Sequence, residues 1–219
     1  MNTHSSRATR SLFSTEARTG SALCSLQFIG SVLLVIGFFG PWVAHPTAAL
    51  TVTGYELSEF AKFFPQVQGG VVPVKRGLFV TPLLAGALSL ALVVHRSSKS
   101  ALVRLAATGL AAFLPLVALP PFQALFESQY RTQLGLVAGA CLLSLPTPLV
   151  RQLSERVRGI FLLLVAVMGA VPALWQALLL RPLVAGLYGT PIRPGWGFIV
   201  CAFGFLTLVI AGLRSIVRG

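Results

Sequence analysis

The sequence predicts an all-α integral membrane protein built as a bundle of six transmembrane helices. Three observations support this fold class. First, 55% of the 219 residues are hydrophobic and only 10% are charged, whereas soluble domains carry about 25% charged residues. Second, long stretches without a charged residue recur along the whole chain. Third, positive charges and aromatic residues divide between alternate connecting segments, as they do in membrane proteins.

Six stretches are long enough to cross a hydrocarbon core of about 30 Å, which takes roughly 20 helical residues. They place the spans near residues 22–43, 77–95, 103–121, 133–150, 158–180 and 196–213. The second and fourth spans are short and contain proline. A five-span arrangement with one re-entrant segment is therefore the alternative.

The distribution of Lys and Arg predicts that both termini lie in the cytoplasm. In that orientation eleven of the 17 Lys and Arg residues fall in inner segments and six in outer loops, as the positive-inside rule expects. We expect cytoplasmic tails over residues 1–21, which are flexible, and 214–219. The membrane that best fits is the inner membrane of a bacterium, although residues 1–21 also have the composition of an organellar transit peptide.

The tryptophans agree with this topology. Trp42, Trp175 and Trp196 fall at the predicted outer ends of spans, and indole rings prefer the headgroup layer, where an apolar ring and a polar tip are both satisfied. We therefore expect all three to be interfacial anchors. Gly40-Pro41 ends the first span because proline cannot continue a helix. The entry to the sixth span, RPGWGF, nearly mirrors GPWV at the exit of the first.

The first outer loop, residues 44–76, predicts a short amphipathic helix. Thr53 and Glu56 have the spacing of a capping box. Three hydrophobic residues then recur on one helical face: Leu57, Phe60 and Phe64. Pro65 is expected to stop this helix, and Gly69-Gly70 to form a joint. The segment is interpreted as a lid over the bundle, with a substrate gate as the alternative.

Polar groups inside the spans need partners, because hydrocarbon offers none. Gln27 and Gln176 are each expected to bond to a neighbouring helix. Gly135 and Gly139 form a small-xxx-small pattern, which predicts a face for close helix packing. A candidate pocket or gate, open to the outside, comprises six residues: Gln176, Trp175, His45, Tyr55, Glu56 and Glu59.

No catalytic, cofactor-binding or metal-binding motif is evident in the sequence. The strongest catalytic hypothesis is acid–base chemistry by His45 with Glu56 or Glu59 at the outer rim. His45 and His95 could each ligate a haem or chlorin, but we interpret both as solvated histidines near the headgroups. Three cysteines, Cys24, Cys141 and Cys201, lie in separate apolar stretches and are expected to pack as small apolar residues.

The net charge of +12 does not indicate nucleic-acid binding, because the cations stand singly between apolar stretches. We interpret them as topology signals and contacts to phospholipids. The first functional hypothesis is a non-catalytic accessory or scaffolding subunit of a larger membrane complex. The expected partners are membrane lipids and other membrane protein subunits, with no nucleic acid. The alternatives are a small-solute carrier or substrate-binding component gated by the first outer loop, and a rim-located enzyme using His45 and Glu56.

Overall fold

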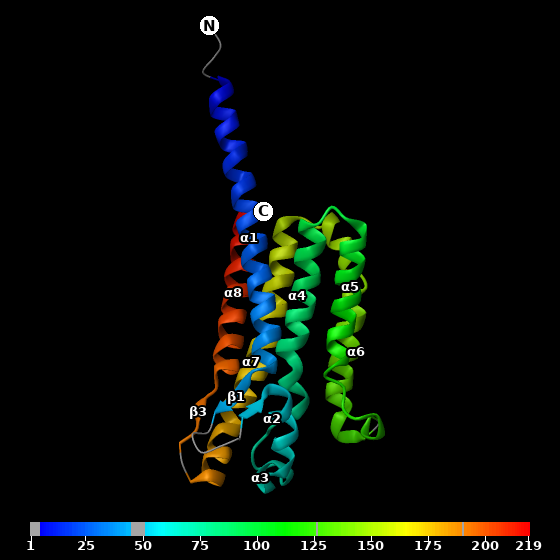
Figure 1. Cartoon of the computed structure of the whole chain (residues 1–219), viewed down its shortest axis with the longest axis vertical. Helices are drawn as coiled ribbons and strands as arrows, with labels where there is room; N and C mark the ends of the chain where they lie inside the picture. The colour runs from blue at the N-terminus through cyan, green and yellow to red at the C-terminus, as the bar shows by residue number, and fades with distance from the viewer. Residues whose placement is uncertain (1–4, 45–50, 126, 190) are drawn as a thin grey trace.

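The structure, a computed structural model, describes residues 5–44, 51–125, 127–189 and 191–219. These residues form a mostly helical protein whose long helices lie side by side (Figure 1). Its α-helices are α1 (Ser5–Phe39), α2 (Gly54–Phe60), α3 (Pro65–Gln68), α4 (Thr81–Ser97), α5 (Ala101–Leu116), α6 (Arg131–Ser144), α7 (Glu155–Tyr188) and α8 (Trp196–Arg218). The 3₁₀ helices are η1 (Ala61–Phe63), η2 (Arg76–Val80), η3 (Phe122–Ala124), η4 (Ser128–Tyr130) and η5 (Thr147–Gln152).

Four of the described helices are long and apolar enough to cross a membrane, as expected of a multi-pass integral membrane protein. They are Ser21–Phe39 within α1, Arg76–Ser97 formed by η2 and α4, α7, and α8. Helices α5 and α6 have 16 and 14 residues and are shorter than the predicted spans 103–121 and 133–150. Prolines explain the difference, since Pro115 lies in the last turn of α5 and Pro146 follows α6.

The bundle has two distinct ends (Figure 1). The tail end holds the C-terminus, the turn between α4 and α5, and the start of α7. The cap end holds the strands, α2, α3 and the connection between α5 and α6. Every segment predicted to be cytoplasmic from residue 96 onwards lies at the tail end, and the described part of loop 44–76 lies at the cap end.

A small antiparallel sheet, which the all-α prediction did not include, closes the cap end. Its strands are β1 (Pro41–Ala44), β2 (Thr51–Thr53) and β3 (Arg193–Pro194), in the order β2-β1-β3. The mirrored GPWV and RPGWGF segments pair with each other in this sheet, with Val43 opposite Pro194. The chain therefore leaves α1 and enters α8 through adjacent strands.

Trp42 is buried by this sheet, with only 3% of its surface exposed. Its Nε1 donates to the carbonyl of Gly37 at 3.0 Å, and its ring packs edge-on against Phe79 and Phe198. The expected interfacial anchor is therefore a core residue, because β1 folds back over the bundle. Trp196, by contrast, is 52% exposed.

Helix α1 begins at Ser5, although a flexible tail was expected over residues 1–21. A helix is costly to start and cheap to extend. The packed part of α1 from residue 21 onwards supplies the start, and the preceding residues extend it beyond the bundle (Figure 1).

Helix α4 is the central helix, with 83% of its apolar stretch buried against 28% for α7. Polar side chains tie it to three neighbours. On the α1 side, the Gln27 amide donates to the Ser89 carbonyl at 3.1 Å. Towards α7, the Thr81 hydroxyl donates to the Gly169 carbonyl at 2.7 Å, and on the α5 side His95 Nε2 lies 2.7 Å from the Thr108 hydroxyl. The prediction that Gln27 bonds to a neighbouring helix is confirmed. The interpretation of His95 as a solvated histidine is wrong, because only 2% of its surface is exposed where α4 packs against α5.

Helices α1 and α8 approach each other so closely that their contact depends on glycine. A Cβ atom added to Gly37 would lie 2.7 Å from the backbone nitrogen of Cys201. One added to Gly204 would lie 3.1 Å from the carbonyl of Gly30. Real Cβ atoms essentially never show a contact as short as 2.7 Å, and one of 3.1 Å is tighter than nine in ten of their contacts. A side chain at Gly37 would therefore force α1 and α8 apart.

Replacing Gly37 by Ala should destabilise the protein, because the new methyl group would overpack the contact between α1 and α8. We expect a loss of about 1–3 kcal/mol, measured as a lower thermal unfolding temperature in mild detergent. The matched control is Gly109→Ala in α5, where no atom lies within 4 Å of the added Cβ. Equal losses in the two variants would contradict the tight contact.

Candidate functional site

A lid at the cap end, formed by α2, η1 and α3, contains three of the six residues predicted for the candidate site: Tyr55, Glu56 and Glu59. The capping box of α2 is confirmed, since Glu56 Oε2 accepts from the Thr53 amide at 2.8 Å and Thr53 Oγ1 accepts from the Glu56 amide at 3.3 Å. The predicted apolar face is confirmed as well, because Leu57 and Phe64 are buried in the core. The helix ends earlier than predicted, because α2 stops at Phe60 and continues as η1, and Pro65 is instead the first residue of α3.

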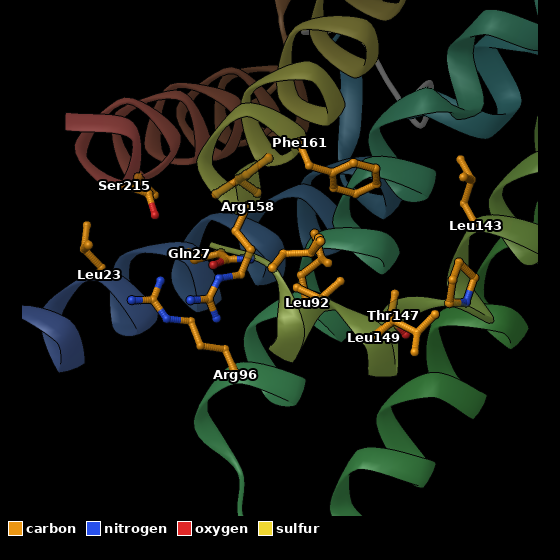
Figure 2. Close-up of a pocket in the computed structure, with 15 residues that line it drawn as sticks. Leu23, Gln27, Leu92, Arg96, Leu143, Thr147, Leu149, Arg158, Phe161 and Ser215 are labelled. Carbon is orange, nitrogen blue, oxygen red and sulfur yellow. The ribbon is translucent and has the colours of Figure 1, made fainter. Parts of the chain in front are cut away.

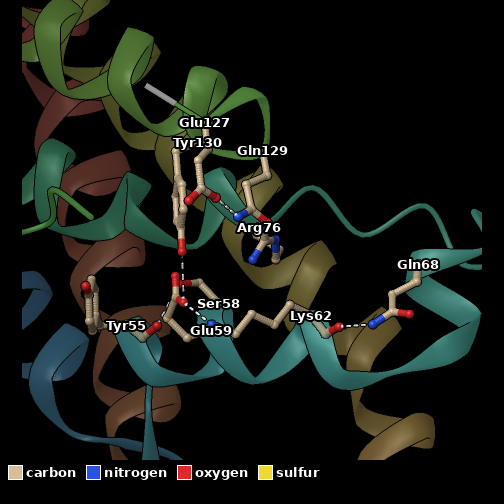
Figure 3. Close-up of polar contacts among 9 residues, drawn as sticks. All are labelled: Tyr55, Ser58, Glu59, Lys62, Gln68, Arg76, Glu127, Gln129 and Tyr130. Carbon is tan, nitrogen blue, oxygen red and sulfur yellow. Dashed lines mark hydrogen bonds and ion pairs between the residues drawn. The ribbon is translucent and has the colours of Figure 1, made fainter. Parts of the chain in front are cut away.

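Glu59 is the centre of a polar cluster that joins α2 to η4 (Figure 3). Its Oε2 accepts from Lys62 Nζ at 3.0 Å and from the Tyr130 hydroxyl at 3.1 Å. The second contact links residues that are 71 positions apart in the chain. Glu59 therefore fastens the lid to the connection between α5 and α6.

Arg76 extends this cluster on the side of η2. Its Nη2 donates to Gln129 Oε1 at 2.6 Å, and the Gln129 amide donates to Glu127. The guanidinium also lies over the Tyr130 ring, 5.4 Å from its centroid. Figure 3 shows these side chains converging from the lid, from η2 and from η4.

Burial and the Glu59 carboxylate shift the protonation of the groups around them. Burial raises the pKa of Tyr130, and the nearby charge of Glu59 raises it further. Burial likewise raises the pKa of Tyr55, with a smaller contribution from Glu59. The hydrogen bond to Glu59 raises the pKa of Lys62. At neutral pH the tyrosines are therefore neutral, Tyr130 acts as a hydrogen-bond donor, and Lys62 is charged.

A wide cleft of about 900 Å³ opens beside the cluster. Three cations line it, Lys62, Lys75 and Arg76, together with Gln68 and Gln129. Arg76 Nη1 is buried and has no hydrogen-bond partner within the described part of the chain. The cleft could therefore accept a small anion, which would find charge and free donors there.

Gln176 and Trp175 do not share a pocket. Gln176 is 5% exposed, and its Oε1 accepts from the backbone amide of Lys75 at 2.9 Å. It fixes the end of the first outer loop to α7, a loop contact in place of the expected helix contact. Trp175, the adjacent residue on α7, points away from this contact and is 59% exposed.

The hypothesis of acid–base chemistry at the rim gains no support from the geometry. His45 lies outside the described residues. Both the backbone and the carboxylate of Glu56 are used in the capping box, and Glu59 is paired with Lys62. Within the described residues, no group of three or more His, Cys, Asp or Glu side chains is placed to hold a metal ion.

Within the described part of the chain, Gly135 and Gly139 do not pack against another helix. No atom lies within 4 Å of a Cβ added to either residue. Both line an apolar groove of about 340 Å³ between α4, α6 and α7. The predicted packing face exists on α6, but it faces an open groove.

A second site, which the sequence analysis missed, lies at the tail end. A cavity of about 200 Å³ is enclosed by α1, α4, α7, α8 and the segment around η5 (Figure 2). Its walls include six residues that define its character: Leu92, Arg96, Leu143, Leu149, Arg158 and Phe161. The sequence analysis interpreted the arginines, like the other cations, as topology signals and contacts to phospholipids, and did not place any of them in a cavity. The available signal was that Arg96 and Arg158 each lie at the end of a long apolar stretch of the sequence.

Glu155 holds the two arginines together beside this cavity. Its Oε1 lies 2.6 Å from Arg158 Nη2, and its Oε2 lies 3.2 Å from Arg96 Nη2. The Ser215 hydroxyl donates to the same carboxylate at 3.2 Å. One carboxylate thus serves two guanidinium groups, which leaves an excess of one positive charge.

Comparisons with protein-family models, curated proteins and solved structures find no significant match to this chain.

Alkaline titration should reveal the raised pKa of Tyr130. Because burial and Glu59 favour the neutral hydroxyl in the folded protein, its contribution to stability is complete below about pH 10 and is lost as the pH rises through the raised value. Tyrosinate absorbance of the wild type minus that of Tyr130→Phe should show a midpoint above 10.0.

Glu59→Gln should lower that midpoint, because it removes the carboxylate charge beside the hydroxyl. A midpoint at or below 10.0 in the wild type, or one that Glu59→Gln leaves unchanged, would contradict this account of the cluster.

Proposed function

We propose that this chain is a non-catalytic multi-pass membrane protein that serves as an accessory or scaffolding subunit of a larger membrane complex. In this proposal all six apolar helices cross a membrane, with the tail end in the cytoplasm. The excess of Lys and Arg in the tail-end segments supports that orientation. A bacterial inner membrane is the setting that we expect.

The observation that carries the proposal is the open glycine face of α6. Elsewhere in this protein, as at Gly37 and Gly204, glycines in helices allow backbones to approach within contact distance. Gly135 and Gly139 offer the same surface to an empty groove. In membranes, small residues mark the faces where helices meet. We therefore infer that a helix of a partner subunit packs against α6 here.

The wall of the groove formed by α7 is also suited to packing against a helix of a partner. Leu164 and Met168 project from α7 and are 56% and 68% exposed, and both line the groove together with the two glycines. Methionine adapts its shape to varied partners. An apolar transmembrane helix would thus meet small residues on one side and large flexible ones on the other.

A second candidate function is the binding of a small anionic solute at the cap end, as a carrier or substrate-binding component would require. The cleft lined by Lys62, Lys75 and Arg76 favours it. The capping box, the sheet and the Gln176 contact hold the first outer loop in place, which disfavours a large gating movement. Binding of inorganic phosphate that Lys75→Gln weakens, but Arg193→Gln does not, would support this candidate.

Purification from the native membrane in mild detergent tests the subunit proposal. The tagged chain should carry stoichiometric partner proteins, identified by mass spectrometry. Gly135→Leu and Gly139→Leu should reduce their yield at least tenfold, because the leucines fill the groove. The matched control, Gly186→Leu in the last turn of α7, also has no atom near its added Cβ and should keep the partners.

Partners that persist after both groove substitutions would exclude this face as the contact. A chain that purifies alone from its native membrane would overturn the proposal.

A further inference from the structure

We propose that the tail-end cavity binds an amphiphile with an acidic headgroup, a phosphate or carboxylate attached to an acyl chain. This inference rests on the cavity between Arg96, Arg158 and η5, and it does not depend on the subunit proposal.

The charge of the cavity selects an anion. Arg96 and Arg158 are largely buried, with 17% and 19% of their side chains exposed, and they share the single carboxylate of Glu155. Arg158 Nε is buried and has no hydrogen-bond partner within the described residues. Guanidinium groups bind phosphate and carboxylate in a fork geometry. An acidic headgroup would use the free donors and offset the excess positive charge.

The sequence provides few competing carboxylates. Of its five acidic residues, Glu56, Glu59 and Glu127 belong to the cap-end segments, and Glu16 precedes the apolar part of α1. The tail end also carries Lys99, Arg156 and Arg214. The local field therefore favours a negatively charged ligand over a neutral one.

The walls of the cavity separate a polar end from an apolar end (Figure 2). The two guanidinium groups lie near Gln27 on one side, and Leu143 and Leu149 lie on the far side. Leu92 and Phe161 stand between them. A ligand that follows this cavity must be charged at one end and apolar along its length.

The apolar end is open to the surroundings of the bundle. Leu143 and Leu149 line the cavity and are 49% and 57% exposed. The cavity volume of about 200 Å³ equals that of roughly seven water molecules at about 30 Å³ each, which suits the first few methylenes of a chain. The remainder of the chain would lie along the lipid-facing side of η5 and α6. Basic pockets between transmembrane helices are known to hold acidic lipid headgroups.

Binding can be measured by thermal shift and native mass spectrometry on the full chain in neutral detergent. The probes are dioctanoyl phosphatidylglycerol, the matched phosphatidylcholine, decanoate, and glycerol phosphate, which has the head without the chain. We expect phosphatidylglycerol, decanoate or both to bind and raise the unfolding temperature, and phosphatidylcholine and glycerol phosphate to bind at least tenfold more weakly. The stronger of the two anionic amphiphiles identifies the source, a membrane phospholipid or a free fatty acid.

Variants of the ion-pair cluster test the role of charge. Arg158→Gln and Arg96→Gln each leave Glu155 paired with the remaining arginine, and each should weaken binding of the anionic amphiphile at least tenfold. Arg214→Gln, which removes an exposed charge from the same end of the bundle, should change it less than twofold. Glu155→Gln should strengthen binding, because it removes the competing carboxylate while Ser215 keeps an acceptor.

Three results would overturn the proposal. One is equal binding of phosphatidylglycerol and phosphatidylcholine, with no binding of decanoate. Another is binding of glycerol phosphate as tight as that of the amphiphiles, which would show a simple anion site. The third is an equal loss in Arg158→Gln and Arg214→Gln. If an arginine variant fails to fold, Glu155→Gln still decides, since weaker binding in that variant would contradict the charge argument.

Discussion

The hydrogen-bonding demand of polar groups in a hydrocarbon environment shapes this bundle, and α4 is where that demand is met. A polar side chain placed in lipid has no water to bond, so it must find protein. Ser89, Thr81 and His95 of α4 each bond to a different neighbouring helix. These contacts set the rotation of α1, α7 and α5 about the central helix. The apolar side chains then fill the remaining space without having to define the arrangement themselves.

Glycine controls how near the helices come in two opposite ways. Between α1 and α8, Gly37 and Gly204 have no side chains, and this lets the two helix backbones lie against each other. On α6 the same residue type is left without a neighbour at Gly135 and Gly139. The protein thus has one glycine face that packs against another helix and one that faces a groove. The groove beside Gly135 and Gly139 is the feature on which the proposal of a partner helix rests.

Local patterns in the sequence predicted structural features that are determined close to their own position in the chain. The capping box of Thr53 and Glu56 followed from their spacing. The cost of an unbonded amide predicted that Gln27 bonds to another helix, but not that its partner is Ser89. The burial of Trp42 did not follow, because it depends on β1 pairing with residues more than 140 positions away. The tail-end cavity was missed for the same reason. Its walls come from five parts of the chain, and neither arginine alone differs from an ordinary topology signal.

The glycine contact between α1 and α8 joins the first long helix to the last one. During synthesis, at about 5–20 residues per second, α8 follows α1 after roughly ten to thirty seconds. Throughout that interval the glycine face of α1 lacks its native cover, and another helix in the membrane could occupy it. Completion of the fold is therefore a late event that the C-terminal helix controls. A nascent chain that stops before α8 would expose a surface well suited to recognition by membrane quality control.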